Sequence, residues 1–492
     1  MQFAVNNNPV MLDNVAPDMT LLRYLRGEQN ITSSLTGTKE GCASGDCGAC
    51  TVLVGRKSAQ GVVYRAVNSC ILPLGSLQNQ YVMTVEGLSN SMALNQLHPV
   101  QKAMVDCHGS QCGFCTPGFV MSLAGLHING TDLHDAPYSL LRAKVLDAIS
   151  GNLCRCTGYR PIVDAGIQAL KIPAQTVNIV QEWQPNAPLA SNPTLTNADH
   201  FYWQPESEAQ LQSLLTDHPD ARLIAGGTDL MLEVSQVYKI LPKLIDITTI
   251  ASLNTVVVDE TQVTIGAATR YSELETALFE LSPEFVKLLG RLGSRQIRNS
   301  GTLGGNICNA SPIADCPPYL LALDAELLIG NRQGDYRREY LSDFYLDYKR
   351  TTLATGEYLA QVVIQRSALA QPLKLYKISK RYEDDISAVM GAFRCDANRL
   401  SIAFGGMAAT PKRARLTEAF LHQHADELDD DLIEQACSIL ASEFSPLSDV
   451  RASAEYRMAM ACNLLKKACY ALLLGAEVGE GPFDHCLEGA HA

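Results

Sequence analysis

Two groups of four cysteines constrain this chain more than any other feature of its sequence. The first group is Cys42, Cys47, Cys50 and Cys70, and the second is Cys112, Cys115, Cys154 and Cys156. Both groups lie in glycine-rich stretches, and the chain starts with neither a basic segment nor an apolar core, so that we expect no export signal. In a reducing cytoplasm such groups predict metal ligands rather than disulfides.

The first group has the spacing CxxxxCxxC between Gly41 and Cys50, and Cys70 follows at a distance. Plant-type ferredoxins bind a [2Fe–2S] cluster with this spacing. Glycines suit such a loop, because turning three thiolates inward and directing N–H groups at sulfur requires backbone angles that a β-carbon resists. The alternative is a zinc site, but zinc prefers two CxxC-like pairs and would leave Cys42 without a role.

The second group combines CxxC with CxC, and each pair precedes a predicted helix start. Proline, glycine and apolar spacing predict helices over 99–107, 116–126, 139–149 and 161–170. The N–H groups at a helix start favour anions, which suits a cluster held by thiolates. We therefore expect a four-helix bundle around a second metal centre, with a structural zinc bundle as the alternative.

The composition fits a large globular chain. It has 492 residues, of which 47% are hydrophobic, so we expect two to four domains with ordinary cores. No apolar run approaches the roughly 20 residues that span a bilayer, so the sequence predicts no membrane segment. The net charge of −13 disfavours binding to nucleic acid.

We predict an α+β multidomain fold with a linker in the middle. The expected parts are a ferredoxin-like domain of the β-grasp type at 1–88, the helical domain at 89–170, a proline-rich linker at 171–199, an α+β domain at 200–372, a small α+β domain at 373–480 and a tail at 481–492. Within the first domain, Asp18 is expected to cap a helix. At the start of the third, Ser207 is expected to do the same.

Two glycine stretches in the third domain have the form of phosphate-binding turns. Residues 223–230 leave a predicted strand and turn at Gly226 and Gly227, and residues 301–306 are similar. Free N–H groups in such turns can hold a pyrophosphate. Neither stretch matches GxGxxG or the P-loop, so ordinary tight turns remain the better explanation from the residues alone.

The chain resembles the molybdenum hydroxylases, the family of xanthine dehydrogenase and aldehyde oxidase. GCASGDCGAC, NSCILPL, QCGFCTPG and GNLCRCTGYRPI are similar to its iron–sulfur half, and LIAGGTDL, NSGTLGGNICNASPIAD and KRYEDDISAV to its FAD domain, which is not a Rossmann fold. The resemblance extends to about residue 474. It implies that both quartets hold [2Fe–2S] clusters and that the second lies beside a molybdopterin. Gln111 would then contact the pterin, whereas from the residues alone it is a solvated loop glutamine.

The resemblance also implies the residues around the flavin. The expected FAD contacts are Leu223, Ile224, Ala225, Gly226, Gly227, Thr228, Asp229, Leu230, Thr302, Leu303, Gly304, Gly305, Asn306, Asp315, Leu359 and Lys377. Leu292 stands where eukaryotic members place an aromatic ring against the isoalloxazine. Tyr348 and the loop 380–386, notably Asp384, would flank the NAD site. The acidic residues of that loop also fit a solvated surface loop.

These features together predict an electron-transfer chain without a catalytic dyad of its own. The resemblance implies that molybdopterin lies on a larger partner, in an assembly of two small and two large chains, and that NAD+ is the acceptor. Clusters and FAD in this order favour the xanthine-oxidising group. The alternatives are another hydroxylase, acting on an aldehyde or a nitrogen heterocycle, and a non-catalytic redox or zinc-scaffold protein. Six further cysteines are expected to be buried apolar residues: Cys308, Cys316, Cys395, Cys437, Cys462 and Cys469.

Overall fold

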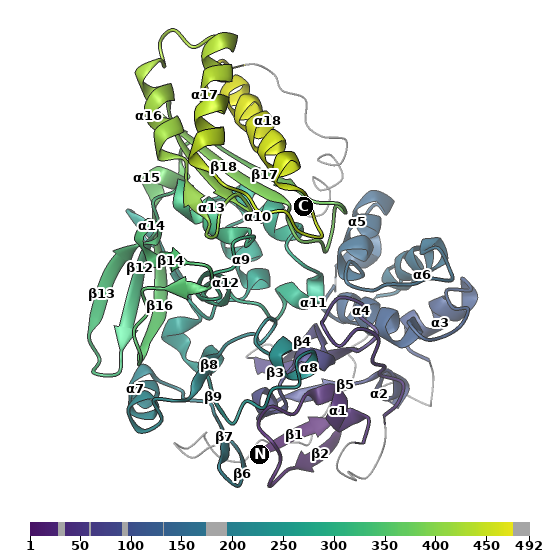
Figure 1. Ribbon diagram of the computed structural model, residues 1–492. Coiled ribbons are helices and arrows are strands. Elements are labelled where there is room, and N and C mark those ends of the chain that lie inside the picture. Colours follow the sequence, from purple (N-terminus) through teal and green to yellow (C-terminus); the bar gives the residue numbers. More distant parts are fainter. Residues whose placement is uncertain (28–34, 59–60, 91–96, 131, 174–193, 476–492) are drawn as a thin grey trace.

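A computed structural model of the protein describes residues 1–27, 35–58, 61–90, 97–130, 132–173 and 194–475. Figure 1 shows several packed regions of sheet and helix, which confirms the predicted multidomain α+β fold. Residues 174–193 of the predicted linker and the predicted tail 481–492 lie outside the described residues. Among the described helices, none combines the length and the apolar character needed to cross a membrane.

The N-terminal region is a five-stranded mixed sheet with the order β2-β1-β5-β3-β4. Its elements are β1 (Gln2–Val5), β2 (Asn8–Met11), α1 (Leu21–Leu25), β3 (Thr51–Ser58), β4 (Gly61–Asn68), β5 (Tyr81–Met83) and α2 (Val85–Asn90). β1 and β2 form an antiparallel pair, because Asn6 and Asn7 adopt the positive φ angles of 49° and 70° that their tight turn requires.

The expected role of Asp18 is wrong. The side chain of Thr20 caps α1 by accepting from the N–H of Arg23. Asp18 is buried and accepts from the backbone N–H of Leu241 at 2.9 Å, far along the chain. The carboxylate therefore satisfies a buried donor at a contact between two regions instead of a helix start.

The next region holds the four predicted helices. They are α3 (Pro99–Asp106), α4 (Thr116–Asn129), α5 (Tyr138–Ala148) and α6 (Arg160–Leu170). Phe119 of α4 is fully buried with Leu141 and Val145 of α5 and Ile162 of α6. Another part of α4 packs against the N-terminal sheet, where Met121 shares a core with Leu53 of β3. α4 therefore joins the bundle to the first region.

Three sheets form the third region. One has the order β6-β7-β9-β8, a second is antiparallel with the order β10-β11-β16-β12-β13, and β14 and β15 form a small two-stranded sheet. The strands are β6 (Leu195–Asn197), β7 (His200–Trp203), β8 (Arg222–Ile224), β9 (Lys243–Asp246), β10 (Val256–Val258), β11 (Gln262–Gly266), β12 (Glu326–Asn331), β13 (Tyr336–Tyr340), β14 (Tyr345–Asp347), β15 (Arg350–Thr351) and β16 (Glu357–Gln365). β6 begins at Leu195, a little before the predicted boundary at 200.

Helices surround these sheets. They are α7 (Glu208–Asp217), α8 (Leu232–Ser235), α9 (Tyr271–Ala277), α10 (Pro283–Gly290), α11 (Arg295–Arg298), α12 (Leu303–Cys308), α13 (Cys316–Ala322), α14 (Leu341–Phe344) and α15 (Arg366–Leu369). Ser207 caps α7 as predicted, since its hydroxyl accepts from the N–H of Gln210 at 3.3 Å.

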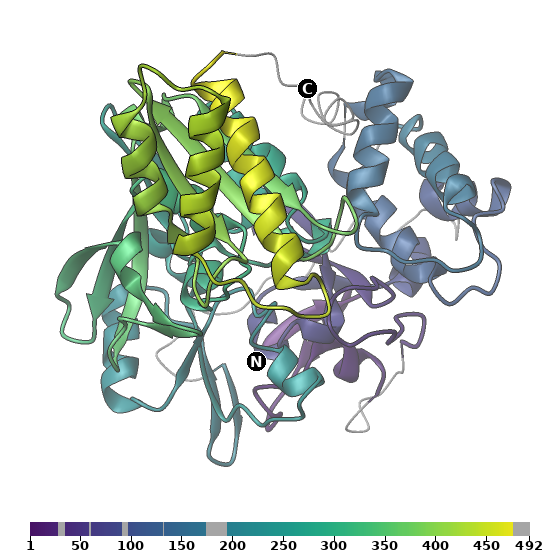
Figure 2. The same ribbon diagram turned by 45° about the horizontal axis from the view of Figure 1, so that its top comes forward.

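The C-terminal region is an antiparallel sheet buried on both faces. Its elements are β17 (Leu373–Ile378), β18 (Val389–Asp396), β19 (Arg399–Gly405), β20 (Lys412–Arg413), α16 (Arg415–Gln423), α17 (Asp430–Glu443) and α18 (Ala454–Leu472). Figure 2 shows the three helices side by side over one face, to which β18 contributes Val389 and Phe393. Met390 and Ala392 point to the other face and join the core of the third region.

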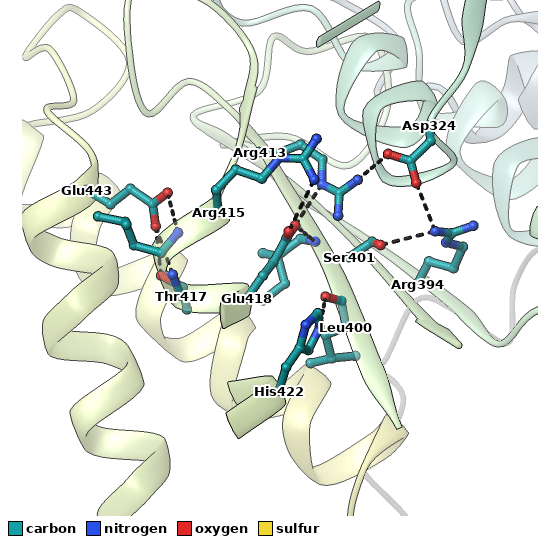
Figure 3. A network of polar contacts seen from close by, with 12 residues as sticks. Asp324, Arg394, Leu400, Ser401, Arg413, Arg415, Thr417, Glu418, His422 and Glu443 are labelled. Atoms are coloured by element: carbon teal, nitrogen blue, oxygen red, sulfur yellow. Dashed lines mark hydrogen bonds and ion pairs between the residues drawn. The ribbon is translucent and has the colours of Figure 1, made fainter. Parts of the chain in front are cut away.

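A network of ion pairs fixes this sheet to the end of α13 (Figure 3). Arg413 pairs with Glu418 of α16 at 2.7 Å and with Asp324, which follows α13. Arg394 of β18 approaches the same Asp324 at 3.0 Å. Glu418 also accepts from the backbone N–H of Ile402 in β19. Two partly or fully buried arginines therefore converge on one aspartate of the third region.

Candidate functional site

The first cysteine quartet is arranged in two pairs. The Sγ atoms of Cys50 and Cys70 lie 3.3 Å apart, and both residues are buried. The thiols of Cys42 and Cys47 contact each other. Each iron of a [2Fe–2S] cluster takes two thiolates, so this pairing fits such a cluster.

The loop that carries this quartet directs backbone donors at sulfur. The N–H groups of Ser44 and Cys47 point at Cys42 Sγ, at 3.4 and 3.3 Å. Gly45 and Gly48 have φ angles of 85° and 64°, in the region that favours glycine. Donors aimed at sulfur stabilise thiolates, which is the property predicted from the glycine content.

The second quartet is also paired, and it lies nearer the surface. The thiols of Cys112 and Cys156 contact each other, as do those of Cys115 and Cys154. Cys112 and Cys156 are exposed. Cys115 is the N-cap residue of α4, immediately before Thr116. Cys112 and Cys115 lie just before α4, and Cys154 and Cys156 lie just before α6, as predicted.

Hydrogen bonds hold the second quartet in place. Cys154 Sγ lies 3.0 Å from the hydroxyl of Thr157 and accepts from its N–H at 3.5 Å. Burial alone would raise the pKa of the Cys154 thiol, but these contacts lower it to about 7. The backbone N–H of Cys154 donates to the Tyr159 hydroxyl at 3.0 Å. The turn therefore favours thiolate at Cys154.

The two cysteine loops touch each other. The backbone N–H of Leu153 donates to the carbonyl of Cys47 at 3.0 Å. Asn152 donates its side-chain amide to the carbonyl of Gly48 at 3.1 Å. A β-carbon on Gly118 would lie 2.1 Å from that carbonyl, so α4 approaches the first loop more closely than another residue would permit. Two hydrogen bonds therefore join the loops of the two quartets.

The first loop also faces the third region. Gln236 donates to the carbonyl of Cys42 at 2.9 Å. A β-carbon on Gly45 would lie 3.1 Å from the side chain of Ile297 in α11. The first quartet is thus placed between the second quartet and the third region.

The two glycine stretches predicted to hold FAD lie side by side. A β-carbon on Gly226 would lie 1.9 Å from the carbonyl oxygen of Ser300 and 2.9 Å from Gly301. Thr302 then caps α12 by accepting from the N–H of Gly305 at 3.1 Å. Close contact between the two backbones explains why the first stretch needs glycine at position 226.

Other predicted FAD residues surround these turns. Lys377 and Asp315, both buried, form an ion pair at 2.7 Å. Leu292, Leu303 and Leu359 share one core. The Oδ1 atom of Asn306 is buried and has no hydrogen-bond partner among the described residues. A buried acceptor without a donor is uncommon in a protein, and a bound hydroxyl or amide would satisfy it. The lining therefore fits a polar ligand such as FAD.

The two residues predicted for the NAD site lie in different loops. Tyr348 is 56% exposed in the turn between β14 and β15. Asp384 lies in the loop between β17 and β18 and has a φ angle of 47°. Burial raises the pKa of Asp384 to about 7, and the nearby carboxylate of Asp46 adds to this rise. The loop therefore lies close to the first cysteine loop. The NAD assignment stays a prediction.

One residue at this site was not found from the sequence. Arg291 donates to the backbone carbonyls of Lys377 and Tyr382, at 3.1 and 3.2 Å, and its guanidinium lies over the Tyr382 ring. It therefore fastens the 380–386 loop beside Leu292. A single arginine in an apolar helix end gives no sequence signal for such a contact.

The thiols of each quartet occur in contacting pairs. This arrangement fits a two-iron cluster. Among the described residues, no group of three or more His, Cys, Asp or Glu side chains is placed to hold a single metal ion. Gln111 is exposed next to Cys112, and its contact with a pterin stays a prediction.

Family models match most of the chain. Residues 84–166 match a [2Fe-2S] binding domain, residues 195–365 match the FAD binding domain in molybdopterin dehydrogenase, and residues 374–472 match the CO dehydrogenase flavoprotein C-terminal domain. The matched ranges follow the regions described above.

The chain is similar to several characterised proteins. It is 32% identical to xanthine dehydrogenase 1 of Arabidopsis thaliana over 87% of this chain, but it spans only 36% of that relative's length. A chain of reconstituted CO dehydrogenase from Oligotropha carboxidovorans is 26% identical, with a TM-score of 0.51 over 56% of this chain and 98% of that one. Quinoline 2-oxidoreductase from Pseudomonas putida 86 shares the fold at 24% identity, with a TM-score of 0.51 over 57% of this chain and 98% of that one.

Three domain matches in this order, on a structure that pairs the cysteines and joins the two glycine turns, lead to one assignment. The chain belongs to the molybdenum hydroxylase family and is its [2Fe–2S]-binding and FAD-binding part.

Proposed function

We propose that this chain transfers electrons from a molybdopterin-bearing partner chain to NAD+ in a xanthine dehydrogenase. The single observation that carries the proposal is the position of the first quartet, between the exposed second quartet and the predicted flavin shell. When bound, [2Fe–2S] clusters exchange single electrons and FAD can exchange either single electrons or a hydride equivalent. A chain with this order of sites can convert single-electron transfer into hydride transfer.

The residues of this chain would hold and space those groups. Cys112, Cys115, Cys154 and Cys156 would hold the cluster nearest the partner, and Cys42, Cys47, Cys50 and Cys70 the inner one. The loop contact between Leu153 and Cys47 keeps the two sites at a fixed separation. The Gly226 and Gly301 turns, with Lys377 and Asp315, would hold FAD.

Exposed apolar side chains support the presence of a partner chain on one side of this protein. Phe114, Tyr138 and Leu153, near the second quartet or at its domain's edge, are 47%, 60% and 45% exposed. Apolar side chains gathered around a metal centre at the surface suit a protein interface. We assign the molybdopterin partner to this side, in an assembly of two chains of each kind, with Gln111 at the contact.

The choice of xanthine rests on the relatives. The xanthine dehydrogenase of Arabidopsis matches 87% of this chain, whereas the CO dehydrogenase chain covers 56%. The [2Fe-2S] and FAD domain matches lie on one polypeptide here, and that relative aligns with most of it. The substrate itself would bind to the partner.

The decisive experiment follows absorbance of the protein purified from its host with its bound partners. Xanthine is added anaerobically, and NAD+ is added afterwards. We expect bleaching by xanthine and recovery with NAD+. Bleaching by NADH but not by xanthine would move the substrate to another hydroxylase reaction. No response to either would contradict the electron-transfer function, as would zinc in place of about four iron atoms per chain.

A variant tests the order of the sites. Cys112→Ser should abolish flavin reduction by xanthine and preserve flavin reduction by NADH, because it removes only the outer site. Cys107→Ser is the matched control, since Cys107 is a half-buried free cysteine of the same domain outside both quartets. If xanthine still reduced the flavin in Cys112→Ser, the proposed order would be wrong.

A further inference from the structure

Two cysteines outside both quartets face each other between α17 and α18. Cys437 Sγ lies 3.7 Å from the carbonyl oxygen of Cys462, and Cys462 Sγ lies 3.7 Å from the carbonyl oxygen of Cys437. The two thiols also contact each other, and both are free. Neither residue belongs to the electron-transfer sites described above.

The two helices are antiparallel and closely packed at this point. Lys466 pairs with Glu434, and the Tyr470 hydroxyl donates to Asp430 at 2.7 Å, so residue numbers rise along one helix as they fall along the other. Next to the two cysteines, Ala436 and Ala461 are fully buried. Small side chains allow the helix backbones to approach. The reciprocal contacts place the two backbones close together, as a disulfide requires.

The two thiols differ in access and in acidity. Cys462 is half-buried, whereas Cys437 is buried. The pKa of the Cys462 thiol is lowered to about 7, mainly by its contact with Cys437. Lys466 also lowers this pKa, whereas burial and Glu434 act to raise it. By contrast, burial raises the pKa of Cys469 on the same helix to about 12. An accessible thiolate beside a buried thiol is the arrangement of an attacking and a resolving cysteine.

We propose that Cys437 and Cys462 form a redox-active dithiol that low-molecular-weight disulfides of the glutathione type convert reversibly into a disulfide. The Cys462 thiolate attacks one sulfur of the reagent and releases one thiolate, which leaves a mixed disulfide on Cys462. Cys437 then attacks the Cys462 sulfur and displaces the second thiolate. The two protein protons pass to the two leaving thiolates. The protein loses two electrons and the reagent gains them.

The disulfide would act on a helix that supports the predicted NAD loop. Arg457, near the start of α18, is buried and donates to the carbonyls of Ala388 and Gly406. Ala388 lies just after the 380–386 loop. Linking α18 to α17 therefore restricts the element that holds one end of this loop. Oxidation should also raise the Tm of the C-terminal region by about 5 °C, because it closes the chain between the two helices.

Peptide mapping tests the proposal. The holoprotein is equilibrated anaerobically with mixtures of reduced and oxidised glutathione, treated with N-ethylmaleimide and digested with trypsin. Cleavage separates Cys437 in 416–451 from Cys462 in 458–466 and from Cys469 in 468–492. We expect a linked peptide of 416–451 and 458–466 that grows with the share of oxidised glutathione and disappears on reduction.

Variants and alkylation give independent controls. Cys462→Ser should remove the linked peptide and the rise in Tm, whereas Cys469→Ala, on the same helix, should keep both. In the native protein, Cys462 should react with N-ethylmaleimide faster than Cys469. This comparison does not require any variant to fold. A Cys462 found only as a mixed disulfide with glutathione, or no linked peptide at any ratio, would overturn the proposal.

Discussion

At the scale of single residues, Asp384 has the most unusual chemistry of the predicted NAD loop. Burial and the Asp46 carboxylate raise its pKa to about 7, although its side chain is only partly buried. The folded protein therefore binds a proton at Asp384 more tightly than the unfolded chain does. Stability from this site is fully present below the ordinary carboxyl pKa and is lost as the pH rises through about 7.

We predict that Asp384→Asn makes the protein less sensitive to pH. At pH 5 the Tm of the variant should differ little from that of the native protein. At pH 8 the variant should have the higher Tm, and its free energy of unfolding should be larger by about 1–2 kcal/mol after allowance for solvent screening. Scanning calorimetry between these pH values measures the difference. Asp385→Asn, in the same loop, is the control. A constant difference across this range would contradict the raised pKa.

A second residue-scale prediction concerns Gly118. Alanine is normally favoured over glycine inside a helix, but a β-carbon here would lie 2.1 Å from the carbonyl oxygen of Gly48. Gly118→Ala should therefore lower stability by about 1–3 kcal/mol. The control is Gly290→Ala, at the end of α10, where no atom lies within 4 Å of the added carbon. Urea unfolding of both variants gives the comparison, and equal effects would show that α4 moves away freely.

At the scale of elements, the C-terminal sheet depends on its ion-pair network. Arg413 has a side chain that is 6% exposed and pairs with a Glu418 side chain that is 5% exposed. Arg415 reaches the same Glu418 at 3.7 Å but is 59% exposed. The two arginines therefore share a partner and differ in burial.

Arg413→Met should lower the free energy of unfolding by about 3–5 kcal/mol, because it leaves a buried carboxylate without its main partner. Arg415→Met should change it by less than about 1 kcal/mol. Urea denaturation followed by circular dichroism measures both. A large loss in the Arg415 variant would mean that charge near Glu418 matters more than burial.

The prediction of elements from the sequence succeeded where the signal is local. Ser207 specifies the start of α7, and proline and glycine mark the four helices of the second region. Local signals failed at Asp18, whose partner Leu241 is distant in the chain. The expected burial of Cys308 and Cys462 was also incomplete, because the exposure of a helical cysteine depends on how its helix packs against its neighbours.

The candidate site shows the same division. Cysteine spacing predicted two groups, and the structure brings each group together as two pairs. The sequence could not predict that Leu153 and Cys47 share a hydrogen bond, or that Arg291 fastens the 380–386 loop. Such contacts depend on how regions pack, and a single arginine or leucine carries no pattern that specifies a distant partner.

At the scale of the whole molecule, a buried ion cluster joins the helical region to the third region. Asp147 of α5 pairs with Arg295 and Arg298 of α11, and Glu275 of α9 contacts both arginines. Although burial opposes it, the two arginines lower the pKa of Asp147 to about 2. The stabilisation is therefore complete above the ordinary carboxyl pKa, including neutral pH, and is lost as the pH falls toward 2.

Asp147→Asn should lower stability at pH 7 by about 3 kcal/mol, because the Arg298 side chain has no exposed surface. Hydrogen exchange should become faster in α5 and α11 and stay unchanged in the C-terminal sheet. Asp164→Asn, at an exposed position of α6 in the same region, is the control. Uniformly faster exchange would mean that the cluster stabilises the whole chain rather than this junction.

The different burial of the two quartets has a consequence for how the protein matures. Cys50 and Cys70 have almost no exposed surface, and Gly45 and Gly48 of their quartet's loop lie against α11 and the second cysteine loop. A carrier that delivers a preformed cluster can reach Cys112 and Cys156 from solvent more readily than this inner pair. We therefore predict that an inner cluster is inserted before the regions close over it, whereas an outer one can be inserted last. Iron starvation during synthesis should thus trap chains that no later supply of clusters can fully repair.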